Sequence, residues 1–220
     1  MIGTATLYDE GLELAYLEQY AGRQTEAKQA LTAVDAALAK VPMEKIDNPA
    51  EIGRAKARYA LLGEKLPRIA ILPYAAPSNP HPCINPDYGA ATVLLLFPEW
   101  CAQCRKMMQT LKDFLLRNNT EKIHAYGLLA LDADEMSADP FKSDSFKDLL
   151  HTPTLTTSSD TPRTFDAVSF PFLVITDGAG KIRFLGTVSQ NAFDAGGFVE
   201  QVIDRNAGKG APDKTPSPRR

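Results

Sequence analysis

The chain has 220 residues, of which 44% are hydrophobic and 23% charged, a composition typical of a globular protein with enough apolar side chains for a core. Its formal net charge of -3 gives no general reason to expect nucleic acid or an anionic membrane as a partner. No apolar run approaches the roughly 20 residues that a membrane-spanning helix needs. The N-terminal MIGTATLYDEG lacks the basic start and apolar core of an export signal, so we expect either a protein that stays inside the cell or a targeting segment absent from this chain.

Residues 5–64 are predicted to be helical. One helix is rich in Ala and Leu, begins at a cap residue, Thr25, and stops before Pro42. The next has Pro49 at its first position and ends before Gly63. A further helix precedes both. No cluster of chemically reactive side chains lies in this region, so we expect a helical extension that packs on the rest of the chain or on a partner.

From residue 66 onward the pattern changes to strands and helices in turn. The continuous apolar runs 92–97 and 123–132 are typical of strands buried on both faces of a sheet. A helix with one apolar face follows the first run. The runs 172–176 and 181–186 flank the turn signal DGAG and predict a hairpin. Parallel crossovers followed by an antiparallel hairpin predict a mixed sheet covered by helices.

Four further segments complete the chain. Residues 75–90 contain four prolines and are predicted to form an irregular loop. Short and closing helices are expected near residues 145–151 and 191–205. The tail 207–220 has no large apolar residue to anchor it and is expected to be disordered.

Two of the three cysteines, Cys101 and Cys104, stand in the stretch FPEWCAQCRKM with the only tryptophan, Trp100, directly before them. Cys101 falls where the buried strand ends and the helix begins, and there the free N–H groups and the helix dipole favour a thiolate. Cys104 lies one turn further on the same side, close enough to form a disulfide with Cys101 and directed more toward the covered face. This predicts that Cys101 attacks and that Cys104 resolves the mixed disulfide. Cys83 is then left unpaired.

The segment LLFPEWCAQC, residues 95–104, resembles the strand and active-site segment of the thioredoxin-like superfamily. The segment FDAVSFPFLVITDGAGKIRFLG, residues 165–186, resembles the part of that superfamily in which a cis-proline precedes a hairpin, which places Phe170 and Pro171 at the cis bond. The segment LGEKLPRIAIL, residues 62–72, is similar to the entry segment of the TlpA/ResA-type thiol–disulfide oxidoreductases and of their peroxiredoxin relatives.

The resemblance covers residues 62–206 and implies an α/β protein with the thioredoxin-like fold, a mixed central sheet flanked by helices. Residues 1–64 are then an all-helical N-terminal extension, residues 65–206 the thioredoxin-like domain, and residues 207–220 the tail.

The chain also departs from this superfamily. Gln103 stands where thioredoxins usually have a proline, which changes the redox poise. Leu95 stands where the family often keeps a buried acid, so another group or water must accept the resolving proton. Pro98, Glu99 and Trp100 stand where peroxiredoxins need a threonine, and we therefore reject a peroxidase as the leading interpretation.

The function expected from this resemblance is thiol–disulfide exchange on protein substrates. Cys101 and Cys104 would carry the exchange, and Trp100, Phe170 and Pro171 would line a substrate groove. The partners are protein thiols or disulfides and a redox partner protein, and no organic cofactor or metal is implied. The TlpA/ResA-like resemblance implies an extracytoplasmic setting, the bacterial periplasm, if an export signal is missing from this chain, and a cytoplasmic one otherwise.

Two alternatives stay open. His81, Cys83, Cys101 and Cys104 form a nominal set of four nitrogen and sulfur ligands for zinc, with two of them in the proline-rich loop. Alternatively, the chain is a binding or scaffold protein that keeps the thioredoxin-like fold with little catalysis.

Overall fold

The computed structural model of this chain describes residues 11, 14–15, 17–19, 21–46, 49–72, 83–84, 90–117, 123–131, 149, 152–167 and 169–187. Within these ranges no helix is both long enough and apolar enough to cross a membrane. The predicted closing helix and tail lie outside the described residues, as does nearly all of the predicted short helix near residues 145–151.

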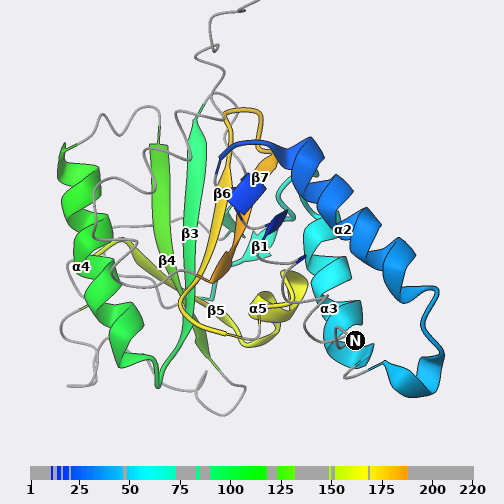
Figure 1. Ribbon diagram of the computed structural model, residues 1–220. Helices are drawn as coiled ribbons and strands as arrows, with labels where there is room; N and C mark the ends of the chain where they lie inside the picture. Colours follow the sequence, from blue (N-terminus) through cyan, green and yellow to red (C-terminus); the bar gives the residue numbers. More distant parts are fainter. Residues whose placement is uncertain are drawn as a thin grey trace, which may run out of the picture.

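A five-stranded mixed sheet, in the order β5-β4-β3-β6-β7, forms the centre of the molecule (Figure 1). Its strands are β3 (Ala91–Pro98), β4 (Ile123–Leu131), β5 (Thr154–Ser158), β6 (Phe172–Thr176) and β7 (Ile182–Thr187). Strands β3, β4 and β5 are parallel, whereas β6 and β7 form an antiparallel hairpin against β3. The mixed sheet flanked by helices confirms the predicted α/β, thioredoxin-like fold.

Helices cover both faces of this sheet. Figure 1 shows α4 (Ala102–Arg117) on one side and α2 (Gln24–Leu38), α3 (Pro49–Ala60) and the short α5 (Asp160–Thr164) on the other. A 3-10 turn, η1 (Met43–Lys45), lies between α2 and α3.

Strand β3 is buried on both faces, as its continuous apolar run predicts. Its odd-numbered residues, such as Leu95 and Phe97, pack with the buried side chains of α4. Its even-numbered residues, Leu94 and Leu96, pack in a second cluster that includes Tyr59 at the end of α3. The sheet therefore separates two apolar cores, and β3 contributes to both.

The N-terminal helices also cover the outer edge of the sheet at β7. The described residues of the first predicted helix, between 11 and 19, are helical, and Gln19 is fully buried. The Gln19 Oε1 atom accepts a hydrogen bond from the Leu185 N–H at 3.2 Å. The Gln24 Nε2 atom donates to the Arg183 carbonyl oxygen at 3.2 Å. Two glutamine side chains thus form hydrogen bonds with backbone groups of β7 that an edge strand would otherwise leave exposed.

The structure corrects two sequence-based expectations about the elements and adds two elements. Helix α2 begins at Gln24 after Arg23 rather than being capped by Thr25. The proline-rich stretch contains a two-residue strand, β2 (Cys83–Ile84), that pairs antiparallel with β1 (Ile69–Ala70), so Cys83 lies in a strand. Strand β5 and helix α5 were not predicted individually.

Candidate active site

Cys101 lies between the end of β3 and the start of α4, as predicted. Its Sγ atom accepts a hydrogen bond from the Cys104 N–H at 3.2 Å, and its carbonyl oxygen accepts one from the Arg105 N–H at 3.3 Å. The Cys101 sulfur thus acts like the side-chain oxygen of a Ser or Asp helix cap, which accepts a hydrogen bond from one of the first free N–H groups of the helix. The same N–H group would stabilise negative charge on this sulfur after reduction.

Cys101 and Cys104 form a disulfide, with their Cα atoms 5.3 Å apart. The two residues differ in exposure, since Cys101 is 6% exposed and Cys104 is fully buried. Cys104 lies in the apolar core beneath α4 together with Leu95 and Met107. The pair therefore joins a sulfur near the surface to one that solvent does not reach.

The described part of the chain buries few polar side chains. They are Gln19 at the β7 edge and several threonines, with no carboxylate, histidine, lysine or arginine among them. Leu95 itself is fully buried between β4 and β6. No charged side chain is therefore buried in the same cluster as Cys104 among the described residues.

Aromatic side chains adjoin the disulfide. The peptide bond between Phe170 and Pro171 is cis, as the resemblance implies, and Pro171 is buried. The Phe170 ring packs against the core that contains both cysteines. It meets the Trp100 ring edge to face, with centroids 6.0 Å apart and an interplanar angle of 79°. Trp100 is 75% exposed, so these two rings present an apolar surface to solvent directly beside Cys101.

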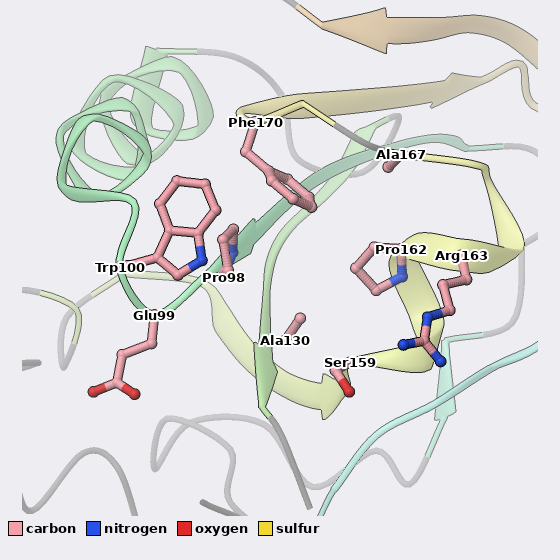
Figure 2. A pocket seen from close by; sticks show the side chains of 9 residues that line it. All are labelled: Pro98, Glu99, Trp100, Ala130, Ser159, Pro162, Arg163, Ala167 and Phe170. Atoms are coloured by element: carbon pink, nitrogen blue, oxygen red, sulfur yellow. The ribbon is translucent and has the colours of Figure 1, made fainter. Parts of the chain in front are cut away.

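A pocket of about 270 Å³ opens beside these rings (Figure 2). One wall comes from the end of β3, with Pro98, Glu99 and Trp100, and Phe170 contributes the adjoining side. Ala130 of β4 also lines it. The pocket thus lies at the carboxyl ends of the parallel strands, where α/β sheets commonly bind ligands.

The opposite wall comes from the segment that follows β5. Ser159, Pro162 and Arg163 line it, with Ala167 just beyond α5. Arg163 Nη1 pairs with Asp160 Oδ1 at 2.7 Å, and both side chains are largely exposed. Sequence reasoning missed this wall, although Ser159, Asp160 and Pro162 together are a typical helix-start signal.

The predicted zinc ligands are only partly covered by the structure. His81 lies outside the described residues, and the Cys83 side chain is also not described. No group of three or more His, Cys, Asp or Glu side chains that could hold a metal ion occurs among the residues that are described. In the oxidised protein Cys101 and Cys104 are bonded to each other, so neither is a free thiolate ligand.

No family model matches the chain, and no curated protein matches it. Among solved structures, the chain is similar to a Chlorobium tepidum protein assigned as the thiol:disulfide interchange protein DsbE, with 17% identity over 67% of this chain and 98% of that one and a TM-score of 0.49. A thiol:disulfide interchange protein from Bacteroides sp. is 17% identical over 69% of this chain and 93% of its own, with a TM-score of 0.47.

The thioredoxin domain of a thiol-disulfide oxidoreductase from Bacteroides vulgatus has 16% identity over 61% of this chain and 94% of that one, with a TM-score of 0.45. The assignment of the thioredoxin-like fold follows from this chain's own sheet order, from Cys101 at the start of α4 and from Pro171 at the start of β6.

Proposed function

We propose that this protein is a thiol–disulfide oxidoreductase that exchanges disulfides with protein substrates through Cys101 and Cys104. The observation that carries the proposal is the disulfide at the start of α4, which links a sulfur near the surface to a fully buried one. A disulfide that only stabilises the fold gains most from closing a long loop, whereas this one closes a loop of a single helical turn.

The exchange can be written as two balanced steps. In reduction of a substrate, the Cys101 thiolate attacks one substrate sulfur, the substrate S–S bond breaks, and the other substrate sulfur leaves as a thiolate that takes a proton from water. Cys104 then loses its proton and attacks the Cys101 sulfur. The Cys101–Cys104 bond forms, the second substrate thiolate leaves, and two electrons have passed to the substrate. Oxidation of a substrate is the same sequence in reverse.

An extended polypeptide fits the surface next to Cys101 better than a small thiol does. The exposed Trp100 ring and the half-buried Phe170 ring form an apolar rim. Pro171 has no N–H group, so the backbone of Phe170 can pair with a substrate strand. We therefore assign Trp100, Phe170 and Pro171 to substrate binding.

The proposal includes a setting outside the cytoplasm, where disulfides persist, and a redox partner protein that resets the Cys101–Cys104 pair after each turnover. Fractionation of cells that make the protein, followed by detection of the protein in each fraction, tests this setting. We expect the protein in the extracytoplasmic fraction, and recovery in the cytoplasm would refute this part of the proposal.

Turnover in insulin reduction by dithiothreitol tests the function itself. We expect the wild-type protein to accelerate the reduction and Cys101→Ser to abolish the acceleration. Cys104→Ser should retain a stable mixed disulfide with the substrate, and Cys83→Ser should match the wild type. A wild-type rate equal to that of Cys101→Ser would favour the scaffold alternative. Stoichiometric zinc in the reduced wild-type protein, lost in Cys83→Ser, would favour the metal site.

A further inference from the structure

The pocket beside the disulfide is bounded by charged side chains of opposite sign. Figure 2 shows Glu99 on the wall that carries Trp100 and Arg163 on the facing wall formed by α5. Apolar groups line the space between them, among them Pro162 and Phe170. The pocket therefore suits a segment with an apolar side chain and a charged group next to it, rather than a purely apolar one.

Arg163 is available to a ligand even though it has an ion pair. Its side chain is 79% exposed and that of its partner Asp160 is 75% exposed. Ion pairs this exposed contribute little to stability, so Arg163 can exchange Asp160 for another carboxylate at small cost. The guanidinium group presents a planar fork of donors that matches a carboxylate with two hydrogen bonds.

The place of the pocket next to Cys101 limits which part of a substrate can enter it. Trp100 lines the pocket and immediately precedes Cys101. An extended chain rises about 3.3 Å per residue, so the residues one or two positions from a substrate cysteine are the ones that can lie over the pocket.

We propose that this pocket selects substrates by sequence, and that Arg163 is the specificity-determining residue that binds a carboxylate one or two residues from the substrate's reactive cysteine. The inference rests on the proposed function, because it presupposes that a polypeptide cysteine reacts with Cys101. It assigns the substrate class as proteins whose exchanged cysteine has an apolar and an acidic neighbour.

Peptide disulfides test the proposal. The probes are short, end-blocked peptides with one cysteine and one phenylalanine, oxidised to homodimers, in which Glu or Lys stands one or two residues before or after the cysteine. The reduced protein is mixed with each dimer, and the second-order rate of peptide-thiol release is measured after acid quenching. Arg163→Glu is the test variant. Lys40→Glu, an exposed position beyond the end of α2, is the control for net charge.

At one or more positions we expect Glu peptides to react about three- to tenfold faster than Lys peptides, the range for an exposed ion pair in place of a repulsion. The preference should reverse in Arg163→Glu, persist in Lys40→Glu and shrink in high salt. Equal rates for Glu and Lys peptides at every position, or a preference that Arg163→Glu leaves unchanged, would overturn the proposal while leaving the exchange function intact. If no peptide is reduced, the proposed function fails and the specificity falls with it.

Discussion

The two sulfurs of the active-site disulfide have different surroundings. Cys101 is slightly exposed, and its sulfur accepts a hydrogen bond from the Cys104 N–H. Cys104 lies in an apolar core, and no charged side chain is buried with it among the described residues. We predict that iodoacetamide at mildly acidic pH labels Cys101 of the reduced protein well before Cys104, as read by peptide mass mapping. Labelling of both at the same rate, or of Cys104 first, would contradict the assigned roles.

Tyr59 gives a second prediction at the residue scale. Its side chain is 5% exposed, and this burial raises the pKa of the Tyr59 phenol above its usual value. The positive charge of Arg58 lowers the same pKa by a smaller amount, and its guanidinium carbon lies 5.4 Å from the ring centroid. The unfolded chain loses the phenol proton near pH 10, whereas the folded chain keeps it to higher pH. The folded state therefore binds more protons above this pH, and its stability falls as pH rises.

Tyr59→Phe removes this proton, so the loss of stability between about pH 9 and pH 11 should be shallower in the variant than in the wild type. Urea unfolding across that range measures the two slopes. The other tyrosines titrate in both proteins, so only the difference between the slopes reports on Tyr59. Parallel slopes would show that the Tyr59 environment is not as described.

The residues that we propose for the exchange could be predicted from the sequence, but the full pocket could not. Cys101, Cys104 and Trp100 are adjacent in sequence, and the strand pattern before them places them at a helix start. Phe170 and Pro171 followed from a recognisable segment. Arg163, by contrast, lines the pocket because β5 pairs with β4, which places α5 at the end of the sheet. No local sequence pattern indicates this tertiary arrangement.

At the scale of elements, the contact between α4 and β4 depends on a glycine. A Cβ atom on Gly127 would overlap the Met108 Sδ atom and lie 3.2 Å from the Phe97 ring. Both neighbours are fully buried, so neither can move away freely. We predict that Gly127→Ala lowers the free energy of unfolding by about 1–3 kcal/mol, the usual effect of overpacking a core.

Gly53 is the matched control, because it lies exposed in α3 with nothing within 4 Å of a built Cβ atom. Gly53→Ala should raise the free energy of unfolding by about 1 kcal/mol, the difference in helix propensity between the two residues. Chemical denaturation of both variants provides the comparison. A Gly127→Ala protein as stable as the wild type would mean that α4 packs less closely on β4.

Strand β5 shows why the sequence reveals some strands and hides others. Strands β3 and β4 are marked by continuous apolar runs, but three of the four buried residues of β5 are threonines, and Leu155 is the fourth. Their hydroxyl groups are satisfied internally, since Thr154 pairs with Thr152, and Thr157 donates to the Ala70 carbonyl oxygen and pairs with Thr161. A polar residue buried with its hydrogen bonds made gives no apolar signal in the sequence.

At the scale of the whole molecule, the helical N-terminal region and the sheet share one core. Tyr59 and Leu62 pack in the same cluster as Leu66 and Ile69. The boundary predicted between residues 64 and 65 also falls within a hydrogen-bonded segment, because Gly63 donates to Ile182 and Ile182 donates to Glu64. The composition of the sequence changes at this point, but the packing is continuous across it.

The hydrogen bond from Leu185 to Gln19 predicts what happens when the N-terminal helices no longer protect β7. Gln19→Ala leaves the buried Leu185 N–H without its acceptor, and a buried group that loses its partner costs about 1–3 kcal/mol. We expect this loss in the free energy of unfolding, together with concentration-dependent self-association through the bared strand edge. Gln29→Ala, an exposed position on α2, is the control and should change neither.

Sedimentation velocity and urea denaturation of the two glutamine variants measure these effects. If Gln19→Ala is as stable and as monodisperse as Gln29→Ala, the helices would not be the feature that protects this edge.

The fluorescence of Trp100 reports whether Cys101 and Cys104 are oxidised or reduced. Trp100 is the only tryptophan in the chain, it precedes Cys101 directly, and its ring is 75% exposed. A disulfide close to an indole accepts an electron from the excited ring and quenches its emission, whereas a pair of thiols quenches it less. Every change of tryptophan emission on reduction therefore comes from this one position, so the oxidation state of the cysteine pair and the proposed binding of peptides can be followed in solution without any attached label.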